Sequence, residues 1–314
     1  MRPEDGRPAP LAASATRALP RTVVVLGLVS LLNDASSEMI TPLLPIFLTA
    51  TLGAGPAIVG LVEGLAEATS SVLKLVAGRL ADRGVDAKSL VVAGYGLSNA
   101  TRPLIGLAAA WSSVLLLRFL DRVGKGFRTA PRDALIAGAT HAADRGRAFG
   151  FHRSMDHAGA VIGPLIAFAL LSMQVELKHV FLASVVPGLL VLLLLMFGLP
   201  RGQPFVAPPR TSFSWRALHG RLRAMILAAG WLALASVPEA FVVLWAIGAG
   251  LSVHWVPLVW AAARLAKMAI AMPAGIVSDR LGRIPVLLGG WSLRVCVLLV
   301  LAALPAAPAH VGLA

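Results

Sequence analysis

Long apolar runs, separated by short segments that hold most of the Lys and Arg, dominate this sequence. Each run has about 18 residues or more, which is the length that an α-helix needs to cross a hydrocarbon core. The composition agrees, because 57% of the residues are hydrophobic and only 14% are charged. Soluble domains carry about a quarter charged residues. We therefore predict an all-α membrane protein that crosses the bilayer several times.

About nine membrane spans are predicted from the apolar runs. They are Thr22–Thr49, Pro56–Leu80, Ser89–Ala110, Trp111–Arg128, Gly146–Met173, Lys178–Leu199, Leu222–Gly248, Val253–Val277 and Ile284–Ala306. A polar, Pro-rich stretch separates the sixth span from the seventh and divides the chain. The expected parts are an N-terminal tail (1–21), a six-helix bundle (22–199), a central loop (200–221) and a second group of helices (222–314).

Lys and Arg gather in alternate connections, which predicts the orientation of the chain. The basic connections hold Arg79, Arg83 and Lys88; Arg128, Arg132, Arg145 and Arg147; Arg201, Arg210, Arg216, Arg221 and Arg223; and Arg280 and Arg283. Because cytoplasmic loops carry the excess of positive charge, we expect a multi-pass inner-membrane protein with a cytoplasmic N-terminus and central loop. This distribution explains the net charge of +13 without a nucleic-acid partner, which would require a solvated basic face.

One loop pattern occurs twice, six spans apart and at the same predicted end. Gly78, Asp82 and Arg83 follow the second span, and Gly275, Asp279, Arg280, Gly282 and Arg283 follow the eighth. Internal repeats of this kind are typical of secondary transporters. The fifth span also holds Gly159-x-x-x-Gly163-Pro164, a pattern that favours close helix approach and bending.

These two patterns resemble the major facilitator superfamily (MFS). The loop copies resemble its Gly-x-x-x-Asp-Arg-x-Gly-x-Arg/Lys signature, although the first copy departs from it at Val85. Gly159, Gly163 and Pro164 resemble its antiporter-associated motif. The resemblance implies transport of a small solute by alternating access. Proton coupling is expected, with export by antiport favoured over uptake of a metabolite or metal by symport.

The resemblance also implies twelve spans in two bundles of six, whereas this chain supplies six plus about three. A fragment, a truncated reading frame and a degenerate family member each explain that difference. A scaffold or sensor that does not transport therefore stays an alternative.

Ionisable residues inside the predicted spans are the main candidates for function, because charges at bilayer depth are costly and mark solute or proton pathways. With a rise of 1.5 Å per residue, Asp34 lies about 18 Å into its span and Glu67 about 16 Å. Asp121, Arg122 and Asp156 lie about 15–17 Å deep by the same arithmetic, close to the midplane where secondary transporters place their sites.

Helical spacing groups these charges into faces. Asp34 with Glu38, and Glu63 with Glu67, are i,i+4 pairs, and His152 shares a face with Asp156. Arg118, Asp121, Arg122 and Lys125 form one stripe. The alternative to a transport role is that these charged residues pair with one another and only hold the helices together. This alternative applies above all to Arg118, Arg122, Lys125, Glu63 and Arg153.

In the resembling family, spans one, four, seven and ten line the central cavity. This placement implies that Asp34, Glu38, the Arg118–Lys125 stripe and Glu239 lie near the pathway. A buried acid can take up and release a proton near neutral pH, and we expect Asp34, Glu38 or Asp121 to do so. The full set of candidates for transport or proton coupling is Asp34, Glu38, Glu67, Arg118, Asp121, Arg122, His152, Asp156 and Glu239.

Two other functions are less well supported by the residues. Met268 and Met272, with His152 and Met155, could serve a soft metal, but methionine in an apolar helix is usually filler, so no metal site and no cofactor are expected. Asn33-Asp34 and Leu120-Asp121-Arg122 faintly resemble membrane prenyltransferases, but those enzymes need repeated Asp-x-x-x-Asp clusters, and such a cluster is not repeated in this sequence, so no enzyme is expected. The expected partners are a small-molecule solute, protons and the lipid bilayer, with the chain as a monomer.

Overall fold

The computed structural model describes residues 18–82, 85–141, 144–199, 215–234, 238–281 and 283–303, which form helices and no strand. In chain order the elements are α1 (Arg21–Ile40), α2 (Leu44–Ile46), η1 (Phe47–Thr51), α3 (Pro56–Asp82), α4 (Ala87–Leu104), η2 (Ile105–Leu107), α5 (Trp111–Gly138), α6 (Arg145–Ser172), α7 (Leu177–Ala183), α8 (Val185–Gly198), η4 (Trp215–Ala217), α9 (Gly220–Leu234), α10 (Glu239–Gly248), η5 (Val253–Trp255), α11 (Val256–Leu281) and α12 (Arg283–Ala303). The prediction of an all-α fold is confirmed. Most of the expected N-terminal tail and of the central loop (200–221) lies outside the described residues.

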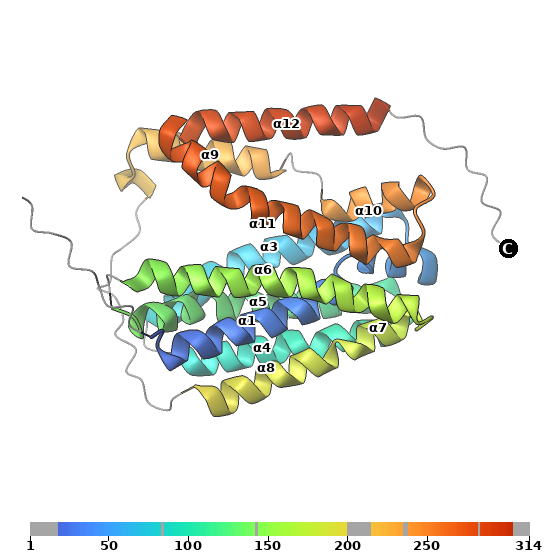
Figure 1. Cartoon of the computed structure of the whole chain (residues 1–314), viewed down its shortest axis with the longest axis horizontal. Coiled ribbons are helices and arrows are strands. Elements are labelled where there is room, and N and C mark those ends of the chain that lie inside the picture. Colours follow the sequence, from blue (N-terminus) through green and yellow to red (C-terminus); the bar gives the residue numbers. More distant parts are fainter. Residues whose placement is uncertain are drawn as a thin grey trace, which may run out of the picture.

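The helices form two groups that lie side by side (Figure 1). Helices α1 and α3–α8 form one bundle, in which α1 packs mainly against α6 and α8, and α5 packs against α3 and α4. Helices α9–α12 lie along one side of that bundle, with α11 against α6. This arrangement places α1, α3, α10 and α11 around the space between the groups.

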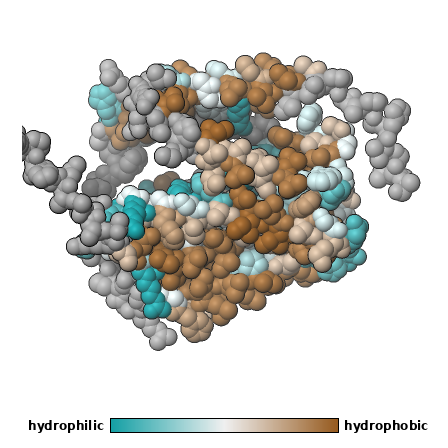
Figure 2. All heavy atoms as spheres, viewed as in Figure 1, coloured by the Kyte–Doolittle hydropathy of each residue, from teal (hydrophilic) through white to brown (hydrophobic). Residues whose placement is uncertain are grey.

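Four stretches among the described residues are long and apolar enough to cross a membrane: Arg21–Thr51, Pro56–Leu80, Arg145–Ser172 and Leu177–Gly198. Helices α5 and α11 have 28 and 26 residues but carry more charged side chains. On the face seen in Figure 2, apolar residues form a broad belt, and hydrophilic residues gather toward its two ends. Large apolar side chains such as Leu75, Phe197 and Trp231 are exposed there or on other faces of the molecule, as a lipid-facing surface requires.

Helix α5 is longer than the fourth predicted span, which was expected to end at Arg128. The helix continues to Gly138, and Arg128 is buried, so the assignment of Arg128 to a basic loop was wrong. Its guanidinium donates to Ser98 Oγ at 2.6 Å and lies 4.4 Å from the centre of the Tyr95 ring. A hydroxyl acceptor and an aromatic face thus replace the solvent that a loop position would supply.

The seventh predicted span is not one continuous helix. Helix α9 ends at Leu234 and α10 begins at Glu239, after Pro238, whose backbone is not helical (ψ 138°). Proline disfavours helical backbone in the residue before it and lacks the N–H that a continuing helix would use. The interruption places Glu239 in the first turn of α10, beside the space between the two groups of helices.

Two apolar clusters form the core of the α1–α8 bundle, and a polar layer separates them along the helices. One cluster contains Val23, Leu26 and Val91 near the start of α1 and of α4. The other contains Met39, Ile105 and Val180 near the opposite ends of these helices and in α7. Between them the same helices bury Asn33, Ser98, Asn99 and Arg102, and α5 buries Asp121.

Candidate functional site

Arg102 and Asp121 form the centre of the buried polar layer. Arg102 Nε donates to Asp121 Oδ1 at 3.0 Å, and Arg102 Nη1 donates to the Asn33 carbonyl oxygen, to Asn33 Oδ1 and to Asn99 Oδ1 at 3.0–3.2 Å. Both side chains are about 1% exposed. A buried ion pair offsets its desolvation only when further hydrogen bonds support it. Arg102 Nη1 makes such bonds to Asn33 and Asn99, and so joins α1, α4 and α5.

Two further arginines of α5 lie beside the same carboxylate. Arg118 Nη1 and Arg122 Nε are 3.6 and 3.5 Å from Asp121 Oδ2. These distances suit electrostatic attraction but exceed good hydrogen bonds. Arg118 also donates to Glu63 Oε1 of α3 at 3.2 Å, whereas Arg122 Nε has no hydrogen-bond partner among the described residues. Three guanidinium groups therefore share one buried carboxylate.

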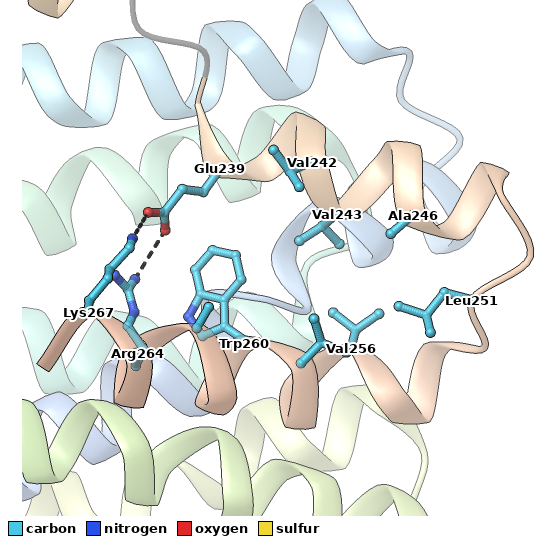
Figure 3. Close-up of a pocket in the computed structure, with 11 residues that line it drawn as sticks. Glu239, Val242, Val243, Ala246, Leu251, Val256, Trp260, Arg264 and Lys267 are labelled. Carbon is cyan, nitrogen blue, oxygen red and sulfur yellow. Dashed lines mark hydrogen bonds and ion pairs between the residues drawn. The ribbon is translucent and has the colours of Figure 1, made fainter. Parts of the chain in front are cut away.

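A second set of ion pairs joins the two groups of helices. Arg264 of α11 lies 3.2 Å from Glu38 of α1, and Trp260 Nε1 donates to Glu38 at 2.8 Å. Arg264 also lies 3.4 Å from Glu239 of α10, which in turn pairs with Lys267 (Figure 3). The Arg264 guanidinium of α11 thus connects the Glu38 carboxylate of α1 to the Glu239 carboxylate of α10.

A cavity of about 920 Å³ lies between these two sets of ion pairs. Its lining comes from α1, α3, α4, α5, α9, α10 and α11, so both groups of helices contribute. The charged residues that line it are Asp34, Glu38, Glu63, Glu67, Glu239, Arg102, Arg118, Arg122, Lys125, Arg128 and Arg264. The arrangement can hold a polar solute away from lipid and surround it with charges of both signs.

The structure brings six of the nine candidates to this cavity: Asp34, Glu38, Glu67, Arg118, Arg122 and Glu239. Asp121 does not line it but lies directly behind, paired with the arginines. His152 and Asp156 do not line it either. Asp156 accepts from Ser30 Oγ of α1 and lies 3.5 Å from His152 Nδ1, so this pair lies at the contact between α6 and α1.

Gly159 and Gly163 lie at the same contact between α6 and α1. A Cβ atom at Gly159 would overlap the Leu31 carbonyl oxygen, and one at Gly163 would overlap the Ala35 carbonyl oxygen. Backbone of one helix therefore rests directly on backbone of the other, as small residues permit. Pro164 follows within α6 and is buried.

The repeated loop pattern ends two helices, α3 at Asp82 and α11 just beyond Asp279 and Arg280. Gly78 lies within α3. Arg83 and Gly282 lie outside the described residues, as do the side chains of Asp82, Asp279, Arg280 and Arg283 and the surroundings of Gly275. The resemblance of this pattern to the family's loop signature therefore stays a prediction from the sequence.

The sequence analysis missed four functional candidates: Arg102, Trp260, Arg264 and Lys267. Arg102, Arg264 and Lys267 each lie inside a predicted span, so the rule that selected Asp34 and Asp121 would have found them. Trp260 carried no comparable signal, because its role is visible only through the hydrogen bond to Glu38.

Comparison with known proteins agrees with this architecture. The sequence profile of the Major Facilitator Superfamily matches residues 26–314. An uncharacterized MFS-type transporter of Methanocaldococcus jannaschii is 32% identical over 282 residues, which are 88% of this chain and 70% of that protein. The multidrug resistance protein MdtH of Aeromonas hydrophila is 30% identical over 151 residues, which are 48% of this chain and 38% of that protein.

Among solved structures, the fold is similar to a bacterial homologue of the human lysosomal transporter Spinster in its inward-facing, unoccupied conformation. The TM-score is 0.64 at 18% sequence identity, and the match covers 85% of this chain and 64% of that one. This chain thus spans somewhat less than two thirds of the structure it matches. The helical architecture, the profile match and the archaeal relative together show that the chain belongs to the Major Facilitator Superfamily.

Proposed function

We propose that this chain carries a small solute across the inner membrane by alternating access, coupled to protons. The observation that carries the proposal is the charged cavity between the two groups of helices, bordered by the Glu38–Arg264 ion pair. In such a carrier, breaking and remaking this pair would let the groups of helices separate on one side and close on the other. The N-terminus and the central loop lie in the cytoplasm in this proposal, as the positions of Lys and Arg predict.

Asp34 is the best placed carrier of the coupled proton. It lines the cavity, and its recorded hydrogen bond is from the neutral Asn33 amide at 3.0 Å. No cation of the described residues lies within ion-pair distance of it. Asp121, in contrast, is surrounded by Arg102, Arg118 and Arg122, which stabilise its charged form. We therefore assign proton exchange to Asp34 and a structural role to Asp121.

Export in exchange for protons is the proposed direction. The partial similarity to MdtH, described as a multidrug resistance protein, supports efflux. The Gly159–Gly163–Pro164 motif supports antiport through its resemblance to the antiporter-associated pattern. Exchange would follow if a proton and a positively charged group of the solute compete for Asp34, because binding of one displaces the other.

Proton-coupled transport can be tested in proteoliposomes that contain the pH indicator pyranine. We expect an outward gradient of ethidium, leucyl-leucine or glycerol 3-phosphate to drive a change in luminal pH, faster than in protein-free liposomes. Asp34→Asn should abolish this change, because an amide cannot exchange a proton, whereas Lys178→Gln, at an exposed position outside the cavity, should leave it unchanged. If the Asp34→Asn variant still couples solute movement to protons, Asp34 does not carry the coupled proton. If the unchanged protein responds to none of the solutes, the transport proposal is rejected.

A further inference from the structure

The charges that line the cavity are not distributed evenly over its walls. Arg264 faces Glu38 and Glu239, Arg118 faces Glu63, and Arg102 is bound by Asp121. Three cations of α5 remain, Arg122, Lys125 and Arg128, at spacings of three residues along one side of the helix. One wall therefore presents positive charge that is only partly compensated.

Arg122 is the strongest sign that this wall is built for a ligand. Its side chain lines the cavity, the residue is 8% exposed, and its Nε has no hydrogen-bond partner among the described residues. A buried guanidinium atom left without an acceptor is costly. Its nearest carboxylate, Asp121, is already bound by Arg102. Because Nε is enclosed and lies 3.5 Å from Asp121 Oδ2, an anionic group in the cavity would be a second charged partner of the guanidinium and not the acceptor of Nε.

Lys125 and Arg128 extend the same wall. No carboxylate of the described residues lies within ion-pair distance of the Lys125 ammonium, and Arg128 is held by Ser98 and Tyr95, which are neutral. Because cations are rarely buried without partners, this wall favours a carboxylate or phosphate from outside the protein.

Two acids line the same cavity and also lack an ion pair among the described residues. Asp34 comes from α1 and Glu67 from α3, whereas the cations come from α5. Asp34 lies within electrostatic range of Lys125 and Arg128 but does not form an ion pair with either. Asp34 also lies within electrostatic range of the Asp156 carboxylate of α6. With the two acids on one wall and the cations on another, the cavity suits a solute that carries both signs.

An apolar pocket of about 200 Å³ adjoins the charged cavity between α10 and α11. Figure 3 shows Val242, Val243, Val256 and Leu251 around it, with Trp260 and Arg264 at the side that it shares with the cavity. This pocket can take an apolar substituent of a solute whose charges lie in the larger cavity.

We infer that the cavity binds a zwitterionic organic solute with an apolar substituent. Its anionic group lies against Arg122 and Lys125, and its cationic group lies against Asp34. This inference rests on the proposed function and specifies its substrate class. It also explains how exchange would work, because a proton on Asp34 removes the charge that holds the cationic end.

Calorimetric titration of the purified full chain in detergent tests the inference without any need for transport. The probes are leucyl-leucine, its N-acetyl derivative, which keeps only the negative charge, and its amide, which keeps only the positive charge. We expect the Kd of leucyl-leucine to be at least about tenfold lower than that of either derivative, since each lost charge removes a charged hydrogen bond. Equal affinity for a derivative, or no binding of leucyl-leucine, would overturn the inference.

Two substitutions assign the charges. Lys125→Gln should raise the Kd of leucyl-leucine to that of the amide, and Asp34→Asn should raise it to that of the N-acetyl derivative. Lys178→Gln, at an exposed position outside the cavity, is the matched control and should leave all three affinities unchanged. Variants that lose affinity for all probes equally would contradict the assignment. Binding without transport would reject the proposed function and leave this inference standing.

Discussion

At the scale of single residues, the Asp121 carboxylate decides which charges of the polar layer are structural. It lies at the meeting point of Arg102, Arg118 and Arg122, and Arg102 is the partner that donates a hydrogen bond to it and further ones to Asn33 and Asn99. Removing one member of a buried pair leaves the other with its desolvation uncompensated. Asp121 and Arg102 are therefore expected to matter for folding before they matter for transport.

Arg102→Leu should destabilise the protein by about 3–5 kcal/mol, the range for breaking a buried ion pair from one side. The thermal unfolding midpoint of the purified protein in detergent measures the effect. Lys178→Gln, which removes an exposed cation, should leave the midpoint nearly unchanged. An unchanged midpoint in Arg102→Leu would show that the pair does not stabilise the fold.

The site residues that could be predicted from the sequence are charged residues near the middle of a predicted span, because the free-energy cost of burying such a charge depends on its depth in the membrane alone. Asp34, Glu67 and Asp121 stood out because each is a charge near the middle of an apolar run. Their partners could not be predicted, because Arg102 and Asp121 meet through the rotation and register of α4 against α5, which side-chain packing decides. Arg128 was misplaced for a related reason: its neutral partners Ser98 and Tyr95 lie in another helix.

At the scale of elements, the helix bundle is stabilised by hydrogen bonds that cap helix starts and by close contacts between helices. Asp86 begins α4: its carboxylate accepts from the Ser89 amide at 2.8 Å and from Ser89 Oγ at 2.6 Å. These hydrogen bonds lower the pKa of Asp86 below its usual value of 3.8, with the Ser89 side chain as the largest cause. The charged carboxylate is therefore the form that stabilises the helix start.

Asp86→Ala should cost about 1 kcal/mol at neutral pH, the usual contribution of a helix N-cap. Because the pKa is lowered on folding, this contribution is complete above the unfolded value and declines as the pH falls through the folded value. Unfolding midpoints of both proteins across acidic pH should therefore converge. Asp86→Asn keeps the cap without titrating, and a cap contribution that stays constant for Asp86 itself would contradict this explanation.

Gly159→Ala should destabilise the protein by about 1–3 kcal/mol, because the new methyl group overlaps the Leu31 carbonyl oxygen and α6 must move away from α1. Gly150→Ala in the same helix is the matched control, since nothing lies within 4 Å of its Cβ position. Alanine there should be neutral or stabilising by up to about 1 kcal/mol. Equal effects of the two substitutions in thermal unfolding would argue against a tight helix contact.

The apolar runs predicted most helices, but not their interruptions. Pro238 lies inside the seventh predicted span, and its effect on the preceding residue was available from the sequence. The start of α10 at Glu239 could have been expected on that basis. The extension of α5 to Gly138 could not, because it depends on burial of Arg128 by a neighbouring helix.

At the scale of the whole molecule, the Glu38–Arg264 pair is a charged contact that joins the α1–α8 bundle to α11. The side chains of both residues are partly buried, at 17% and 23% exposed. Such a pair favours one conformation of the protein over others, because it stabilises only the arrangement in which α1 and α11 lie together. The opposite charges carry that role in the proposed function, while the Trp260 hydrogen bond to Glu38 and the Glu239 pair with Arg264 add to it.

Glu38→Arg should slow solute flux in proteoliposomes at least about tenfold, because two like charges then oppose each other across the contact. Arg264→Glu should do the same. The double variant restores opposite signs and should recover a substantial part of the flux. If the double variant is no better than the single variants, the two residues do not act as a pair.

The backbone contact at Gly159 and Gly163 has a mechanical consequence for a carrier of this kind. At these two positions the backbones of α1 and α6 rest on each other with no side chain between them, so we expect the two helices to move together as one rigid unit. Glu38 lies on α1, so in the proposed function its ion pair with Arg264 must break before α1 and α6 can move away from α11. In the proposed carrier this pair keeps α1 and α11 together while the cavity is empty, which would limit the leak of ions and solutes across the membrane.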